Sequence, residues 1–230
     1  MAARQLTLDL CCGKKHDFDS FLGEGSEQIC QQIKDIICCE PSFVYLHGGV
    51  SVGKTHLLDS SCRLALSKGN NAMYLDMRNI HAWSPDVLSG LAGLGVVCLD
   101  NIESIAGNYA WEESVFNLYN RAIEAKTPLV ISGEFLPKDI GFVLPDLRTR
   151  LGSGVSFHLY DLNDNGKIKV MKNKALSMGF DLEDKHFEYI IHNYNRDLAM
   201  LLDLIEKIAS ITFETKKKVS FSNIKTAMSI

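Results

Sequence analysis

The segment at 48–55, GGVSVGKT, constrains the fold more than any other part of the sequence because it fits G-x-x-x-x-G-K-[ST]. An apolar run at 43–46 precedes it and a helical pattern follows it. Glycines in such a loop let backbone N–H groups turn toward phosphates, and the helix start adds partial positive charge. The segment therefore predicts a P-loop rather than a ligand-free glycine-rich turn. The residues expected to bind nucleotide here are Gly48, Gly49, Val50, Ser51, Val52, Gly53, Lys54, Thr55 and His56.

Short apolar runs alternate with helical patterns through the first two thirds of the chain, which predicts an α/β fold with a parallel five-stranded sheet. The expected strands are 43–46, 72–75, 96–99, 129–132 and 155–159, and the expected helices are 26–39, 54–68, 85–92 and 112–126. After Asp161 only helical patterns follow, at 167–178, 183–193, 196–214 and 221–228. We expect a tail at 1–12, a nucleotide-binding domain at 13–163 and a C-terminal helical lid domain at 164–230.

Composition narrows the functional classes. No run approaches the roughly 18 apolar residues of a membrane span, so we expect a cytoplasmic chain with no membrane partner. The seven cysteines include the adjacent pairs Cys11-Cys12 and Cys38-Cys39 rather than C-x-x-C pairs, which favours free thiols over zinc. A net charge of −4 argues against a dedicated DNA-binding surface.

The run VVCLDNIE at 96–103 supplies the expected second half of the site. An acid at the end of a buried strand lies beside a P-loop, so Asp100 is predicted to hold Mg²⁺ together with Thr55, while Lys54 reaches the β- and γ-phosphates. Asn101 follows where many hydrolysing P-loop enzymes have a second acid. An amide cannot take a proton from water, so we expect weak intrinsic hydrolysis, with Glu103 as a distant substitute.

Several further segments resemble the DnaA/Hda family of AAA+ P-loop NTPases. LVISGE at 129–134 resembles its sensor-1 strand, with Ser132 near the γ-phosphate, and NRDLAMLL at 195–202 resembles its sensor-2 motif, with Arg196. LPDLRTRLGSG at 144–154 resembles the segment of the arginine finger, which this resemblance assigns to Arg150. HDFDSFLGEGSE at 16–27 resembles the segment that folds over adenine. The adenine contacts it implies are Phe18, Phe21 and Leu22.

The ends of the sequence extend the resemblance to the short Hda branch of this family. The helix-turn-helix domain of DnaA does not follow the lid, and QLTLDL at 5–10 resembles the Q-L-x-L-x-L peptides that bind the sliding clamp, the β subunit of DNA polymerase III. The clamp contacts would be Gln5, Leu6, Leu8 and Leu10. The resemblance implies a negative regulator of replication initiation. Bound to the DNA-loaded clamp, and so to DNA only indirectly, it would promote ATP hydrolysis on DnaA.

Other interpretations remain open at this point. The alternating tail is also typical of an added edge strand, Arg150 could be a surface arginine, and Arg196 could serve only to pack its helix. A DnaC-type helicase loader and an autonomous remodelling ATPase are alternative functions. The sequence does not decide between ADP and ATP as the active ligand, or whether the chain forms a homo-oligomer.

Overall fold

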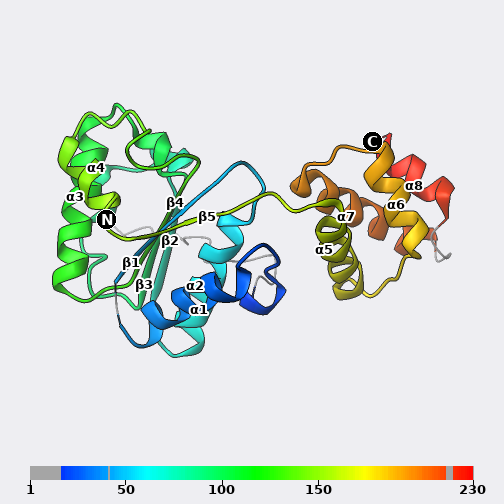
Figure 1. The fold of residues 1–230 in the computed structure, drawn as a ribbon, viewed down its shortest axis with the longest axis horizontal. Helices are drawn as coiled ribbons and strands as arrows, with labels where there is room; N and C mark the ends of the chain where they lie inside the picture. Colours follow the sequence, from blue (N-terminus) through cyan, green and yellow to red (C-terminus); the bar gives the residue numbers. More distant parts are fainter. Residues whose placement is uncertain (1–16, 41, 216–219, 230) are drawn as a thin grey trace, which may run out of the picture. The chain divides into compact units, whose positions relative to one another are not determined.

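The computed structural model describes residues 17–40, 42–215 and 220–229. The described chain forms two compact units that divide between Tyr160 and Asp161 (Figure 1). The proposed clamp-binding residues Gln5, Leu6, Leu8 and Leu10 lie outside the described residues.

The first unit is built on one parallel sheet with the strand order β2-β3-β4-β1-β5. Its strands are β1 (Phe43–His47), β2 (Ala72–Asp76), β3 (Val96–Asp100), β4 (Leu129–Gly133) and β5 (Val155–His158). Each neighbouring pair runs parallel, so all carboxyl ends lie at one edge. The predicted α/β fold with a five-stranded parallel sheet is confirmed.

Helices cover both faces of this sheet because its strands are apolar on both sides. Val44 and Leu46 belong to the core beneath α1 (Ser26–Cys38) and α2 (Lys54–Ser67). Phe43 and Tyr45 point the other way, into the core beneath α3 (Tyr109–Glu124) and α4 (Pro145–Leu151). Figure 1 shows these two helical layers with the strands between them.

The prediction of a helix at 85–92 is wrong. The chain between β2 and β3 instead forms two 3-10 segments, η2 (Met77–Ala82) and η3 (Pro85–Leu88). Ser84 caps η3 through a bond from the backbone N–H of Asp86, Pro85 starts it, and Gly90 leaves the helical region at φ 86°. A proline and a left-handed glycine only five residues apart leave too little chain for a stable α-helix. Two more 3-10 segments are η1 (Phe18–Ser20) and η4 (Ile102–Ile105).

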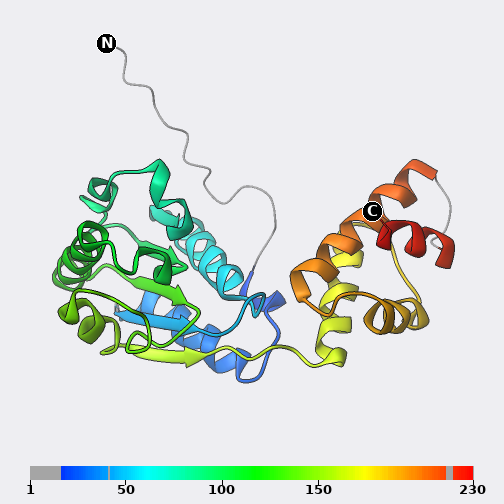
Figure 2. The ribbon, with the colours of Figure 1, turned by 90° about the horizontal axis from the view of Figure 1, so that it is seen from above.

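The second unit is helical throughout its described part. It contains α5 (Asp164–Ser177), α6 (Asp184–Asn193), α7 (Leu198–Thr215) and α8 (Phe221–Met228). These helices form one bundle (Figure 2). They share an apolar core, which includes Phe187 and Ile205. The described helices of the whole chain include none long and apolar enough to cross a membrane.

Candidate nucleotide-binding site

The loop between β1 and α2 can form only because glycine occupies two of its positions. Gly48 has φ 152°, and a Cβ there would lie 2.3 Å from the carbonyl oxygen of Leu159. Gly53 has φ 98°, and a Cβ there would lie 2.7 Å from the Phe21 ring. Side chains at either position would collide and strain the backbone. The structure thus has the tight turn that the motif predicts.

Lys54 starts α2 and folds its side chain back over the loop. Its Nζ donates hydrogen bonds to the carbonyl oxygens of Gly48 and Gly49, both at 2.6 Å. Burial lowers the pKa of Lys54, against the opposing effect of the acids Asp100, Glu103 and Glu134. In a nucleotide complex, phosphate oxygens would replace the two carbonyls as acceptors for this ammonium group.

Asp100 ends β3 as a fully buried carboxylate that accepts four hydrogen bonds. Its Oδ2 accepts from the hydroxyls of Thr55 at 2.6 Å and Tyr74 at 2.8 Å. Its Oδ1 accepts from the hydroxyl of Ser132 and from the backbone N–H of Asn101 at 3.1 Å. The structure thus joins Thr55, Asp100 and Ser132, which come from three distant parts of the sequence. A hydroxyl beside a carboxylate fits the oxygen ligand set of Mg²⁺.

Asn101 directs its side chain to β2. Its Nδ2 donates to Oδ1 of Asp76 at 2.9 Å, while its backbone is left-handed at φ 56°. Asp76 also binds Arg78, with Nη2 to Oδ2 at 2.6 Å. Burial acts to raise the pKa of Asp76, but the hydrogen bonds from Arg78 and Asn101 outweigh it and hold this pKa below its ordinary value. An ionised carboxylate therefore fixes the amide that stands in the place of a second acid.

Glu103 belongs to η4, and its side chain reaches the end of β4. Its Oε2 accepts from the backbone N–H of Glu134 at 3.1 Å. The hydroxyl of Tyr45 donates to the carbonyl of Phe135 at 2.8 Å, and burial followed by the charge of Glu103 raises its pKa. Glu103 thus stabilises the chain that leaves β4.

The segment before α1 packs on the start of α2. Phe18 and Phe21 are buried, Leu22 is partly buried, and the Phe21 ring lies 5.7 Å from the ring of His56. The Nε2 of His56 lies 2.8 Å from the carbonyl oxygen of Asp17. Burial lowers the pKa of His56, although the Asp17 contact opposes it. The predicted adenine contacts thus adjoin the P-loop helix, with Phe21 held against Gly53.

Arg150 lies on α4, away from these contacts. The buried residues Leu147 and Leu151 attach α4 to the core, and Arg148 and Arg150 are exposed. Within the described ranges of the chain, neither guanidinium makes a hydrogen bond or an ion pair. Both arginines are therefore free to meet a partner.

Arg196 belongs to the second unit. Its Nη1 lies 3.7 Å from Oδ2 of Asp164, and its carbonyl accepts from Nζ of Lys167 at 2.8 Å. Lys167 is almost fully buried and also binds Oδ2 of Asp161 at 2.7 Å. This lysine therefore ties the start of the lid to the turn that carries Arg196.

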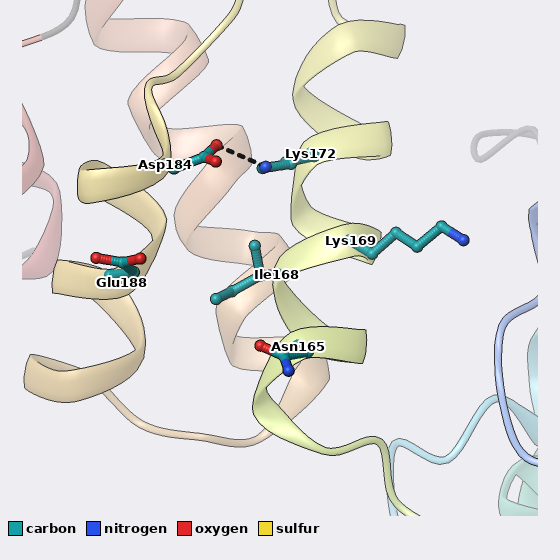
Figure 3. Close-up of a pocket in the computed structure, with 6 residues that line it drawn as sticks. All are labelled: Asn165, Ile168, Lys169, Lys172, Asp184 and Glu188. Carbon is teal, nitrogen blue, oxygen red and sulfur yellow. Dashed lines mark ion pairs between the residues drawn. The ribbon is translucent and has the colours of Figure 1, made fainter.

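The second unit also has a pocket between α5 and α6 (Figure 3). The Nζ of Lys172 pairs there with Oδ1 of Asp184 at 2.5 Å. None of the predicted nucleotide contacts lines this pocket. Its lining residues are Asn165, Ile168, Lys169, Lys172, Asp184 and Glu188.

Sequence reasoning missed the residues that hold the site together. Tyr74, Asp76 and Lys167 belong to no motif, and their roles depend on which strands or turns become neighbours. The signal for Asp76 was its place at the end of an apolar run, as for Asp100, because carboxyl ends of parallel strands meet at one edge. In the structure Asp76 lies opposite Asp100 in the strand register.

The parallel sheet, the P-loop with its strand-end acid and the helical second unit define an AAA+ P-loop fold. Domain III of the replication initiation protein DnaA from Thermotoga maritima is similar to this chain with a TM-score of 0.81 and 16% identity, covering 94% of this chain and 97% of that one. AMPPCP-bound DnaA from Aquifex aeolicus gives 0.71 at 20% identity, over 88% of this chain and 67% of that one. A RuvB variant from Thermotoga maritima is similar with a TM-score of 0.69 and 17% identity, covering 93% of this chain and 71% of that one.

The second unit is matched separately. Residues 164–228 match the family model described as "Hda, lid domain". The chain thus has an AAA+ fold similar to that of DnaA domain III, and its second unit resembles the Hda lid.

Proposed function

We propose that this chain, bound to the DNA-loaded sliding clamp, promotes hydrolysis of the ATP carried by DnaA and so acts as a negative regulator of replication initiation. The observation that carries this proposal is an exposed arginine, Arg150, that pairs with none of the described residues and lies on a helix anchored to the core of a protein with an Hda-type lid. The DnaA of Aquifex aeolicus binds an ATP analogue, AMPPCP. In the proposed complex, Arg150 would contact a nucleotide of this class that is bound to DnaA.

Arg150 would act in trans on the nucleotide of DnaA. A guanidinium placed beside a γ-phosphate stabilises the negative charge that develops in the transition state. Such arginines raise hydrolysis rates by about 10³- to 10⁵-fold. Since Arg150 pairs with no residue that the structure describes, none of these contacts has to break when it enters the partner's site.

The chain's own site would hold an adenine nucleotide without turning it over rapidly. Lys54, Thr55 and Asp100 would hold its phosphates and Mg²⁺, with Ser132 and Arg196 as the sensor residues. Asn101 is bound to Asp76 through its amide and carries no carboxylate that could accept a proton from water. The bound nucleotide would thus stabilise the conformation that presents Arg150.

The tail at 5–10 would capture the clamp. Leu6, Leu8 and Leu10 would anchor it in an apolar pocket and Gln5 would fix its register. A short tether raises the effective concentration of the regulator near DnaA on the same DNA.

The test measures ATP hydrolysis by DnaA with DNA-loaded clamp and increasing amounts of this protein. Arg150→Ala is expected to abolish the stimulation while nucleotide and clamp binding persist. Arg148→Ala is the matched control, since it removes another exposed arginine from the same helix. Deletion of residues 5–10 is expected to abolish clamp capture and leave nucleotide binding unchanged.

Normal stimulation by Arg150→Ala would overturn the assignment of the arginine finger. Absence of stimulation by the folded, nucleotide-bound wild-type protein would overturn the regulator function. Capture of the replicative helicase would then favour the helicase-loader alternative, and rapid hydrolysis by the chain alone would favour an autonomous ATPase.

A further inference from the structure

Glu112, near the start of α3, is a fully buried carboxylate to which the P-loop site assigns no role. Among the described residues, no cation pairs with it. Its Oε1 accepts from the backbone N–H groups of Gly107 at 2.8 Å and Val143 at 3.1 Å, and its Oε2 accepts from that of Leu144 at 2.7 Å. Burying a charge is costly unless such donors compensate it, so the three bonds explain how Glu112 is accommodated.

Two of these donors lie at the start of α4. The N-cap residue of α4 is Leu144, whose side chain accepts no hydrogen bond, and Pro145 occupies the first turn. A helix start needs acceptors for its free N–H groups. No side chain near the start of α4 provides an acceptor at the N-cap. The carboxylate of Glu112 on α3 provides it instead, for the N–H of Leu144.

The far end of α4 is tied to the same helix. The Tyr119 hydroxyl lies 3.0 Å from Oγ of Ser153, which donates to the carbonyl of Arg150 at 2.7 Å. Glu112 and Tyr119 are seven residues apart and therefore share one face of α3. The two helices lie side by side in Figure 1.

We propose that Glu112 is a positioning residue that fixes helix α4 on α3 and thereby sets where Arg150 reaches the partner's nucleotide. This inference rests on the proposed function. The reach of an arginine that acts on another subunit depends on the orientation of its helix, because displacement of a catalytic group by about 1 Å can cost about 100-fold in rate. Glu112 holds the loop before α4, and Tyr119 holds the end of the helix at Ser153.

Glu112→Gln tests the proposal with little change in volume. Whichever way the amide lies, its NH₂ faces at least one backbone N–H at the start of α4, so a bond there is lost. Glu113→Gln is the matched control, because Glu113 is the exposed neighbour on the same helix. Tyr119→Phe is a second variant, which removes only the hydroxyl at the other end.

The maximal stimulated rate of DnaA hydrolysis should fall about 10-fold in Glu112→Gln, and by a smaller factor in Tyr119→Phe. The half-saturating concentration, the clamp affinity and the nucleotide affinity should stay within twofold of wild type. Glu113→Gln should match wild type throughout. A purely structural role would instead lower the folded fraction and the nucleotide affinity and leave the maximal rate unchanged at saturation.

Arg150→Ala, assayed in parallel, separates the two proposals. If Arg150→Ala abolishes stimulation and folded Glu112→Gln and Tyr119→Phe both reach the wild-type maximal rate, the positioning role is overturned and the arginine finger stands. If Arg150→Ala stimulates normally, the proposed function itself fails. If Glu112→Gln does not fold, Tyr119→Phe decides: a lowered maximal rate supports positioning and an unchanged rate overturns it.

Discussion

The Thr55 hydroxyl donates a 2.6 Å hydrogen bond to Oδ2 of Asp100, which joins the first turn of α2 to the end of β3. The same oxygen accepts from Tyr74 at 2.8 Å, and the other oxygen accepts from Ser132 and the backbone of Asn101. A metal ion that uses Thr55 as a ligand has to compete with this network. Metal binding and the hydrogen bonds of Asp100 are therefore coupled.

Lys54→Ala is expected to lower the affinity for ADP and ATP about 10- to 100-fold. Charged hydrogen bonds contribute about 1.5–3 kcal/mol each, and about 1.4 kcal/mol corresponds to a factor of ten. Isothermal titration calorimetry measures the change. Lys68→Ala, at the exposed end of α2, is the control and should bind as wild type does. Equal affinities for the two variants would contradict the role of Lys54.

Tyr74→Phe is expected to make the Mg²⁺-dependent part of nucleotide affinity larger, by about three- to tenfold. The variant removes one of the two donors to Oδ2 of Asp100, and loss of a hydrogen bond to a buried charged acceptor costs about 1–3 kcal/mol in the free protein. Mg²⁺ and its water ligands then supply the interaction that this oxygen has lost. Titrations with ADP in Mg²⁺ and in EDTA measure the difference, and Tyr109→Phe, an exposed tyrosine, is the control. No change in the Mg²⁺ dependence would refute the coupling.

The parallel sheet could be predicted from the sequence, because each strand is a short apolar run and each crossover contains glycine or proline. It also located Lys54, Thr55 and Asp100, since the P-loop and strand-end acid follow from local pattern. It did not identify Tyr74, Asp76 or Glu112, whose partners lie 26, 25 and about 31 residues away in the chain. Those contacts depend on strand register and on the packing of α4 against α3, which no local periodicity encodes.

Acid is expected to destabilise the first unit partly through His47. Burial, followed by the charges of His158 and Lys54, lowers the pKa of His47 below its ordinary value of 6.5, and the His158 ring stacks on it at 4.7 Å. As the pH falls through 6.5, the unfolded chain takes up this proton first, so the free energy of unfolding decreases until the folded pKa is passed. Urea unfolding at pH 7.5 and 5.5 should show a smaller loss in His47→Gln.

His192→Gln is the control for that measurement, because His192 is exposed in the lid. It should lose as much stability on acidification as wild type does. His56, whose pKa is also lowered by burial, should preserve part of the acid sensitivity in the His47 variant. An identical loss in His47→Gln and wild type would rule out a contribution from His47.

Asn101→Asp is expected to lower the free energy of unfolding at pH 7 by about 1–3 kcal/mol, since it replaces a hydrogen bond to an ionised acid with two facing carboxylates. The amide now lies 2.9 Å from Oδ1 of Asp76, and Arg78 can offset only part of the added charge. One of the two carboxyl pKa values must rise above its unfolded value. Stability is then lost as the pH rises through that pKa, so the deficit relative to wild type should shrink near pH 4.

The double variant Asp76→Asn/Asn101→Asp distinguishes repulsion from simple loss of Asn101. It restores an acid–amide pair with the charges exchanged, so it should recover part of the lost stability at pH 7 although Arg78 loses its carboxylate. Urea unfolding of the wild type, both single variants and the double variant gives the coupling energy between the two positions. A double variant whose losses merely add would show that Asp76 and Asn101 act independently. The bond from Asn101 would then not be what fixes the end of β3 against β2.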